Sequence, residues 1–226
     1  MSYDRTLATV ETYFDKTATR TWERLTSDAP VSRIRETVRR GRDAMRAHML
    51  DRLPHDLNGT RILDAGCGAG QMTAELAQRG AEVVAVDISP SLLGIARNRL
   101  PEALHPYVSF HSGDMLSEDL GYFDHVLAMD SLIYYHDHDI AQSLSGLKGR
   151  TSGRIVFTVA PRTPLLMAMW YAGKLFPRSD RSPTMIPQSP AKLAQTYTRT
   201  QGRGQVTPLT RITSGFYISQ AMEVVG

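Results

Sequence analysis

An acid and three glycines lie close together near the end of the first third of the chain. Asp64 ends a short apolar run, and Gly66, Gly68 and Gly70 follow at alternating positions. Glycine lets a backbone turn sharply and lets a ligand come close, so this loop predicts a ligand site between a buried strand and a helix. The order acid-x-G-x-G-x-G differs from the G-x-G-x-x-G of a dinucleotide fingerprint, which makes a nicotinamide dehydrogenase a poor match.

Acids also follow the next two predicted strands. Asp87 ends the second strand, where an acid in a doubly wound sheet can accept hydrogen bonds from both hydroxyls of a ribose. An alternative role for Asp87 is to cap the next helix, but Ser89 already fits that position. Ile88 is expected to pack against an adenine. After the third strand, Asp114 is placed to accept from the adenine amino group and Met115 to lie against its ring.

These residues lie in a region where strands and helices alternate. We expect strands at Arg61–Asp64, Glu82–Asp87, Val108–His111, Phe123–Met129 and Arg154–Ala160, and helices at Gln71–Arg79, Pro90–Leu100 and His138–Leu147. Such alternation predicts an α/β fold with a parallel sheet and right-handed crossovers. Its ligand belongs at the carboxyl ends of the strands, where the acids lie.

The glycine loop resembles motif I of the S-adenosylmethionine (SAM) methyltransferases. An acid beside the loop suits a cofactor that carries an ammonium and a sulfonium. The resemblance implies a Rossmann-like class I fold with a mostly parallel seven-stranded sheet and a C-terminal antiparallel hairpin. It also implies that Asp64, Gly66, Gly68, Asp87 and Asp130 bind SAM, with S-adenosylhomocysteine (SAH) as the product. The loop after Asp130 should then face the methyl group.

Two further regions flank the alternating one. Residues 1–58 are predicted to form an N-terminal helical cap, with one helix capped by Ser32, and residues 59–226 the SAM-binding domain. A lid insertion is expected at about 161–188. It contains the apolar run Leu165–Phe176, too short to cross a bilayer, which needs about twenty residues. Three roles stay open for this run: a core helix, a lid over an apolar acceptor, or a helix at a membrane surface. A helix at 190–197 and a hairpin of strands at 204–212 and 216–225 complete the sheet.

Charge divides unevenly along the chain, whose net charge is +3. Residues 62–160 carry 6 basic and 12 acidic side chains, whereas residues 161–226 carry 8 and 2. The acidic part suits cationic SAM, and the basic part suits an anionic acceptor, an anionic membrane surface or nucleic acid. Cys67 is the only cysteine, which excludes a disulfide framework and a thiolate zinc site. No N-terminal hydrophobic signal stretch is visible, so we expect a cytoplasmic protein.

Nearly the whole chain resembles one family, the magnesium-protoporphyrin IX O-methyltransferases of (bacterio)chlorophyll synthesis, and its bacterial branch most of all. The resemblance is carried by Tyr13-Phe14, Thr21-Trp22-Glu23-Arg24, Ile34-Arg35, Val38 to Arg42, Asp64 to Gly70, Asp130 to Tyr135 and Ser214 to Tyr217. It implies O-methylation of a propionate of magnesium-protoporphyrin IX with SAM. The metal then belongs to the substrate, and no protein-bound metal is expected. The resemblance also suggests a magnesium-chelatase subunit as a partner and peripheral contact with the photosynthetic membrane.

One loop departs from the oxygenic branch of this family. That branch typically has Leu-Ile-His-Tyr, where this chain has Leu132-Ile133-Tyr134-Tyr135, so a role for the histidine cannot be transferred unchanged. A carboxylate acceptor, with a pKa near 4, is ionised at neutral pH and needs no base. We therefore predict a neutral donor near the reacting oxygen, with Tyr134 and His136 as the catalytic candidates.

Other candidates come from the N-terminal segment. Arg35, Arg39 and Arg42 recur at helical spacing and form one stripe, which predicts contact with the acceptor or with a surface. A solvated helix face is the alternative explanation. Tyr13 is expected to fold over the cofactor, although core packing explains it nearly as well.

Two other functions stay open at this point. A SAM-dependent O-methyltransferase of a quinone-type phenol would need a base, so loss of activity on substitution of His136 or His138 would favour it. A non-catalytic SAM-binding protein could associate with nucleic acid through its basic ends. The arginines are not interleaved with stacking aromatics, so no nucleic-acid partner is expected.

Overall fold

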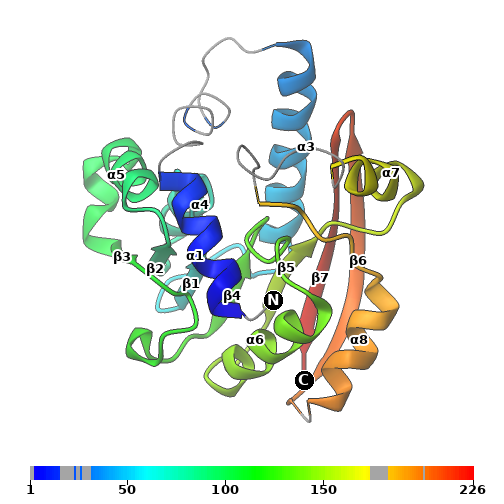
Figure 1. Cartoon of the computed structure of the whole chain (residues 1–226). Helices are drawn as coiled ribbons and strands as arrows, with labels where there is room; N and C mark the ends of the chain where they lie inside the picture. Colours follow the sequence, from blue (N-terminus) through cyan, green and yellow to red (C-terminus); the bar gives the residue numbers. More distant parts are fainter. Residues whose placement is uncertain (1–2, 16–22, 24–25, 27–31, 174–182, 201) are drawn as a thin grey trace.

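A single twisted sheet forms the centre of the computed structural model, which describes residues 3–15, 23, 26, 32–173, 183–200 and 202–226 (Figure 1). Its strand order is β3-β2-β1-β4-β5-β7-β6. The strands are β1 (Arg61–Ala65), β2 (Glu82–Asp87), β3 (Val108–Ser112), β4 (His125–Ala128), β5 (Ile155–Val159), β6 (Gln205–Ser214) and β7 (Tyr217–Val225). Strands β1 to β5 pair in parallel, while β7 runs antiparallel to β5 and to β6. Successive strands are added on one side of β1 as far as β3 and on its other side from β4 onward. A ligand site is expected at this switch point between β1 and β4.

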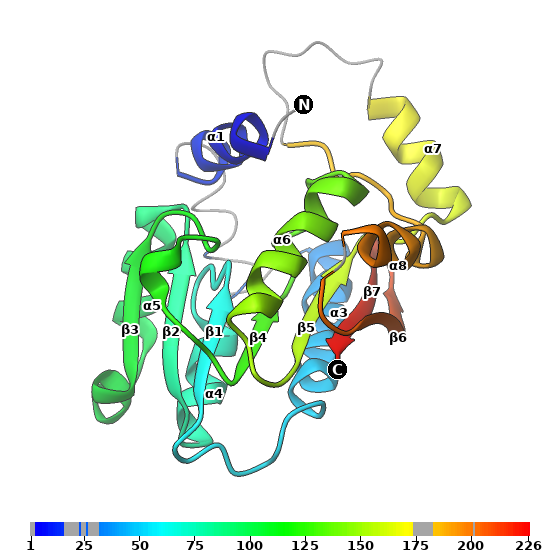
Figure 2. The ribbon, with the colours of Figure 1, turned by 90° about the horizontal axis from the view of Figure 1, so that it is seen from below.

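Helices cover both faces of this sheet. The described helices are α1 (Tyr3–Tyr13), α3 (Arg33–Leu50), α4 (Gln71–Gln78), α5 (Pro90–Arg99), α6 (Asp137–Gly149), α7 (Pro164–Gly173) and α8 (Pro190–Arg199), with short 3-10 helices at Glu102–Tyr107 and Glu118–Leu120. Figure 2 shows α6 and α8 on the near face, with α3 and α4 behind the sheet. Side chains alternate across β1, so Leu63 packs with the α6 and α8 side and Ile62 with the α3 and α4 side.

Serine caps and prolines fix where two of the helices begin. The Ser89 hydroxyl accepts from the Leu92 N–H at the start of α5, and Ser189 does the same for Lys192 at the start of α8. A proline follows each serine at the first helical position, where its missing N–H costs nothing. Because α5 follows β2 directly, its cap also fixes the end of β2, which carries Asp87.

Helix α3 lies against the C-terminal hairpin, although the two are far apart in the chain (Figure 1). Gly41 faces the Tyr217 ring so closely that an added Cβ would lie 2.5 Å from it. The Ser214 hydroxyl donates to the Thr37 carbonyl at 2.7 Å. The hairpin therefore holds α3 in place beside the carboxyl ends of β1 and β4.

The fold predicted from the sequence is confirmed, including the parallel sheet and the C-terminal antiparallel hairpin. Ser32 caps α3 as expected, accepting from the Arg35 N–H. The fourth strand is shorter than predicted. Asp124 leaves it to accept the Arg61 N–H at 2.9 Å, and Asp130 turns into the left-handed region at φ 57°.

The predicted apolar run at 165–176 is helical as far as the structure describes it. Leu166 is buried with Ile133 and Ala160, while Leu165 and Tyr171 are exposed. Residues 174–176 of the run lie outside the described residues, as do Thr21, Trp22 and Arg24. Across the part of the chain that is described, no helix is long and apolar enough to span a bilayer.

Candidate active site

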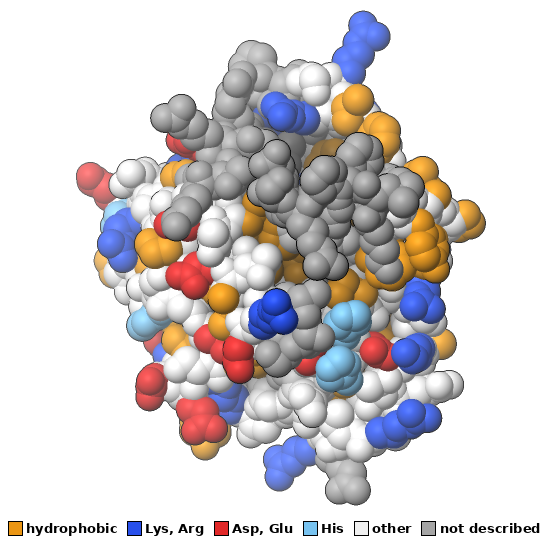
Figure 3. Space-filling model, in the orientation of Figure 1, with side chains coloured by type: hydrophobic (Ala, Val, Ile, Leu, Met, Phe, Trp, Pro, Cys, Tyr) orange, Lys and Arg blue, Asp and Glu red, His pale blue; other side chains and the backbone are white. Residues whose placement is uncertain are grey.

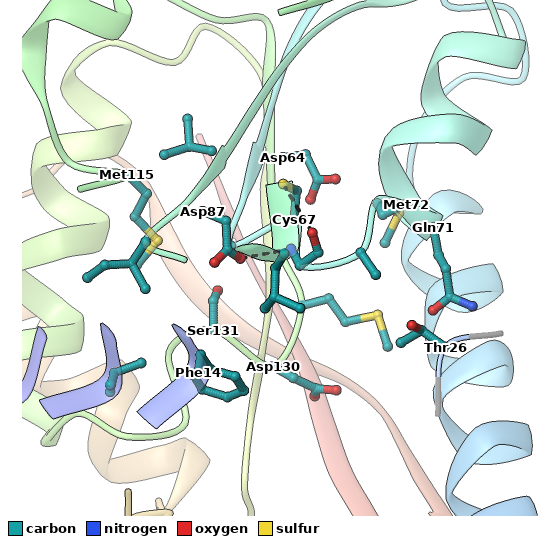
Figure 4. A pocket seen from close by; sticks show the side chains of 18 of the residues that line it. Phe14, Thr26, Asp64, Cys67, Gln71, Met72, Asp87, Met115, Asp130 and Ser131 are labelled. Carbon is teal, nitrogen blue, oxygen red and sulfur yellow. Dashed lines mark hydrogen bonds between the residues drawn. The ribbon is translucent and has the colours of Figure 1, made fainter. Parts of the chain in front are cut away.

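A largely apolar pocket opens at the carboxyl ends of β1, β2 and β4 (Figure 4). The glycine loop forms one wall, and Ile88, Leu92 and Met115 line the part beyond β2. Leu7, Val10 and Phe14 of the N-terminal segment cover it, which places α1 over the loop. Such a pocket suits a ligand that is mostly apolar with a few fixed polar groups.

Asp64 lies at the base of the glycine loop and is 1% exposed. Its carboxylate accepts a hydrogen bond from the Thr73 hydroxyl at 2.6 Å. Burial raises the pKa of Asp64 to about 7, and the bond from Thr73 opposes that rise. A cation bound in the pocket would favour the ionised carboxylate, so this acid suits a positively charged ligand.

Gly66 has a left-handed backbone, with φ at +81°, and no room for a side chain. A Cβ added there would lie 2.4 Å from the Cβ of Ser131. The loops after β1 and β4 therefore touch at this glycine. A Cβ at Gly68, in contrast, would meet no atom within 4 Å, which leaves that side of the loop open for a ligand.

Asp87 holds the glycine loop against the end of β2. Its carboxylate accepts the Gly68 N–H at 2.8 Å (Figure 4). It also accepts the Ser89 N–H at 2.9 Å. Burial raises the pKa of Asp87, and these backbone bonds act against that rise. An ionised carboxylate has about four acceptor positions, so Asp87 can still accept hydrogen bonds from two ligand hydroxyls.

Asp130 joins three elements at the other end of the pocket. Arg42 of α3 forms an ion pair with it, and the Tyr217 hydroxyl of β7 donates to it at 3.2 Å. The Asp130 N–H donates to the Thr158 hydroxyl of β5 at 2.7 Å. Among the described residues, Asp130 is the only non-glycine with positive φ, a strained conformation for which these bonds compensate.

Tyr134 lines the pocket in the loop that follows Asp130. Its ring meets Phe14 edge-on, with the centroids 6.1 Å apart. Burial, and then the negative charge of Asp130, raises the pKa of Tyr134 above its ordinary value. Its hydroxyl therefore stays protonated at neutral pH, where it can donate a hydrogen bond but cannot serve readily as a base.

Most of the residues predicted from the sequence line this pocket. They are Asp64, Gly66, Gly68, Asp87, Ile88, Met115, Asp130, Tyr134 and Arg42. Asp114 is beside the pocket rather than in its lining, and its carboxylate accepts from the Tyr3 hydroxyl at 2.7 Å and the Leu116 N–H at 2.9 Å.

Four more predicted residues lie outside the lining, besides Asp114. Tyr13 packs edge-on against Phe14, and it is Phe14 that faces the pocket. His136 occupies the N-cap position of α6 without a capping hydrogen bond from its side chain, and it stacks on His138 with the ring centroids 5.9 Å apart. Arg35 is exposed, and Arg39 lies 3.7 Å from Glu36. Of the predicted arginine stripe, only Arg42 reaches the pocket.

Several lining residues were not predicted. Leu7, Val10 and Phe14 recur at helical spacing, a signal that was present in the sequence. Arg46 lies one helical turn after Arg42 and pairs with Asp43 and Glu75. Ser131, between Asp130 and Tyr134, has no recognisable pattern of its own.

The donor set of the pocket fits SAM. Two buried acids flank an open glycine loop, and the apolar part beyond β2 suits an adenine. A metal is not suggested by this chemistry. Within residues that the structure describes, no group of three or more His, Cys, Asp or Glu side chains is placed to hold a metal ion.

The sheet order, the glycine loop and the acids at the strand ends define a class I SAM-dependent methyltransferase. A family model for a methyltransferase domain matches residues 62–150, and one for the C-terminus of magnesium-protoporphyrin IX methyltransferase matches residues 128–226. The chain is 57% identical to the magnesium-protoporphyrin O-methyltransferase of Rhodobacter capsulatus, over 95% of this chain and 94% of that protein. It belongs to the magnesium-protoporphyrin O-methyltransferase family.

A solved structure agrees with this assignment. The crystal structure of magnesium protoporphyrin IX methyltransferase from Synechocystis PCC 6803 with bound SAH has a TM-score of 0.80 and 27% identity, covering 96% of this chain and 98% of that one. The chloroplastic magnesium protoporphyrin IX methyltransferase of Arabidopsis thaliana is 26% identical, over 96% of this chain and 70% of that protein. Both similarities extend beyond the sheet to the N-terminal and C-terminal parts.

Proposed function

We propose that this protein transfers the methyl group of SAM to a propionate carboxylate of magnesium-protoporphyrin IX. The products are the monomethyl ester and SAH, in the pathway to (bacterio)chlorophyll. The 57% identity to the Rhodobacter capsulatus enzyme, nearly end to end, carries the proposal. The pocket supports it, because its acids suit the cationic cofactor and its lining beyond β2 is apolar.

The chemistry needs positioning more than proton transfer. SAM supplies a methyl group on a positively charged sulfur. A carboxylate oxygen forms a bond to the methyl carbon as the carbon–sulfur bond breaks and its electron pair returns to the sulfur. The carboxylate is ionised at neutral pH, so no base is required. Holding the two reactants in line can contribute roughly 7–11 kcal/mol toward the barrier.

The residues around Tyr134 suit this task. Its hydroxyl is a neutral donor that can orient the carboxylate without holding its charge strongly. A free arginine would stabilise the ground-state carboxylate, whose charge is lost on transfer. Arg42 lies at this end of the pocket, but its charge is balanced by Asp130. The ion pair therefore leaves the acceptor end nearly neutral.

The protein is also proposed to touch a membrane surface through α7 and the neighbouring hairpin turn. Leu165 and Tyr171 of α7 are 48% and 58% exposed, and Phe216 at the turn is 54% exposed. Figure 3 shows hydrophobic side chains gathered on the side of the molecule that carries α7. Cosedimentation with anionic vesicles tests this contact, and Leu165→Ser with Tyr171→Ser should reduce it.

A magnesium-chelatase subunit is proposed as a partner on the family resemblance alone. A pull-down with the purified subunit tests it. No binding at micromolar concentrations would contradict the partnership and leave the methyl transfer unaffected.

The proposed reaction is tested by incubating the purified protein with SAM and magnesium-protoporphyrin IX. Mass spectrometry should find one added methyl group, on a propionate, together with an equal amount of SAH. SAM binding without a porphyrin product would overturn the proposed acceptor. A screen of phenols would then test the alternative chemistry, for which a base would be needed.

A further inference from the structure

Ser131 carries a buried hydroxyl that the mechanism does not use. Its Oγ is shielded from solvent and has no hydrogen-bond partner among the described residues. The residue lines the pocket, and Figure 4 shows its hydroxyl directed inward, on the side of Asp87. Most buried polar side-chain atoms in proteins have a partner, so an exception inside a ligand pocket points to the ligand.

The backbone before Ser131 is fixed firmly. Asp130 has its left-handed conformation because α3, β5 and β7 each bind it, through Arg42, Thr158 and Tyr217. That turn at the end of β4 sets the direction in which Ser131 leaves the strand. The position of the hydroxyl is thus set by three elements rather than by the loop alone.

The size of this side chain is limited by the glycine loop. The Cα of Gly66 lies against Ser131, so that an added Cβ at Gly66 would be 2.4 Å from the serine Cβ and 3.2 Å from its Oγ. Only a small residue fits at 131. Alanine would also fit and would leave no polar atom unpaired, so packing alone does not explain the serine.

We infer that the Ser131 hydroxyl binds the amino-acid end of SAM. The inference rests on the proposed use of SAM and adds a cofactor contact to it. Asp87, at the end of β2, is placed for the ribose, whereas Ser131 lies where the loops after β1 and β4 meet. The part of the cofactor beyond the ribose therefore passes Ser131. A hydroxyl can accept from its ammonium or donate to its carboxylate.

The test compares two ligands by titration calorimetry without any acceptor. SAH has the amino-acid end, and 5′-methylthioadenosine has the same nucleoside and a thioether but lacks that end. In Ser131→Ala the Kd for SAH should rise about tenfold, as expected for losing a hydrogen bond to a charged group, while the Kd for 5′-methylthioadenosine stays within about twofold. Ser109→Ala, on β3 and outside the pocket lining, is the matched control and should bind both ligands as the wild type does.

Two results would overturn the inference. An unchanged Kd for SAH would show that the hydroxyl does not touch the cofactor. An equal loss of affinity for both ligands would indicate that the hydroxyl contacts the nucleoside and not the amino-acid end. These binding results do not depend on the porphyrin, so failure of the proposed reaction is detected separately. If both proposals hold, Ser131→Ala raises KM for SAM about tenfold and leaves kcat nearly unchanged.

Discussion

Arg42 and Asp130 are 88 residues apart in the chain and form an ion pair that lines one end of the pocket. Arg42 comes from α3, before the first strand, and Asp130 from the loop after β4. Their side chains are only 16% and 10% exposed. Because a buried ion pair is costly to break, a change at either residue should destabilise this end of the pocket.

Removing the charge of Asp130 should destabilise the protein strongly. Asparagine tolerates a left-handed backbone as well as aspartate does, so Asp130→Asn keeps the backbone and the size of the side chain while it removes the charge and one acceptor oxygen. The variant removes the Asp130 charge from an ion pair whose Arg42 side chain is only 16% exposed, and it should lose about 3 kcal/mol of unfolding free energy in urea titrations.

A surface ion pair provides the control for this measurement. Asp137 pairs with Lys192 at 2.7 Å, but the lysine side chain is 61% exposed. Asp137→Asn should therefore cost less than about 1 kcal/mol. Equal losses in the two variants would mean that burial does not strengthen the pair in the pocket.

Affinity for SAM should rise with pH up to about 7. Asp64 has a raised pKa of about 7 in the unliganded protein, and a bound cation favours its ionised form. Below that pH, binding must release a proton, so the association constant increases by about tenfold per pH unit and becomes level above about 7. The stability of the unliganded protein should change in the opposite direction, falling as the pH rises from about 4 to about 7, because the folded state holds this proton more tightly.

Calorimetry in buffers of different ionisation enthalpy measures the released proton directly. Asp64→Asn has no such proton to release. The slope of the logarithm of the association constant against pH should therefore fall by about one in that variant. Burial also raises the pKa of Asp87, so a smaller slope can remain. An unchanged slope in Asp64→Asn would assign the titration to another group.

Gly66→Ala should damage both folding and binding. The added Cβ would overlap Ser131, and the backbone at φ +81° disfavours alanine. The free energy of unfolding should therefore fall by at least about 2 kcal/mol. Gly94→Ala is the matched control. Gly94 lies within α5, and an added Cβ there meets no atom within 4 Å. Gly94→Ala should raise the free energy of unfolding by up to about 1 kcal/mol, because alanine favours a helix more than glycine does.

Tyr134 and His136 should differ in their importance for methyl transfer. Tyr134→Phe removes one neutral hydrogen bond from the acceptor end and should lower kcat about three- to tenfold. His136→Ala changes a residue outside the pocket lining and should leave kcat within about twofold. A loss of a hundredfold or more in His136→Ala would indicate a base and an acceptor other than a carboxylate.

Asp87→Ala should weaken SAM and SAH binding by at least tenfold while the protein stays folded. Part of the loss comes from the loop, since Asp87 also accepts the Gly68 N–H. Asp87→Asn retains one acceptor oxygen, so its affinity for SAM and SAH should lie between those of Asp87→Ala and the wild type. Equal affinity in Asp87→Ala and the wild type, measured by calorimetry, would show that the end of β2 does not bind the cofactor.

The sequence predicted the features that depend on local pattern. The acid-glycine loop, the acids at strand ends and the alternation of strands with helices are short-range signals, and each corresponds to an observed element. Asp64, Asp87 and Met115 were found in this way because the carboxyl ends of parallel strands meet at one edge of a sheet.

Features that depend on tertiary contacts were not predictable. Arg42 was proposed together with Arg35 and Arg39, and only the position of Asp130 explains why Arg42 alone lines the pocket. Phe14 rather than Tyr13 lines the pocket, where its ring packs edge-on against Tyr134, and a contact between such distant parts of the chain leaves no local signal. Ser131 is recognisable only from its contact with Gly66.

The ion pair between α3 and the β4 loop also limits how this enzyme can be recombined with its relatives. Tyr217 touches both Gly41 of α3 and the Asp130 carboxylate, so three separate parts of the chain share one junction. A chimera that exchanged only the sheet residues would combine unmatched surfaces there. Crossovers should be tolerated where α3 and the C-terminal hairpin are inherited from the same parent, which makes the two ends of the chain a single unit of inheritance.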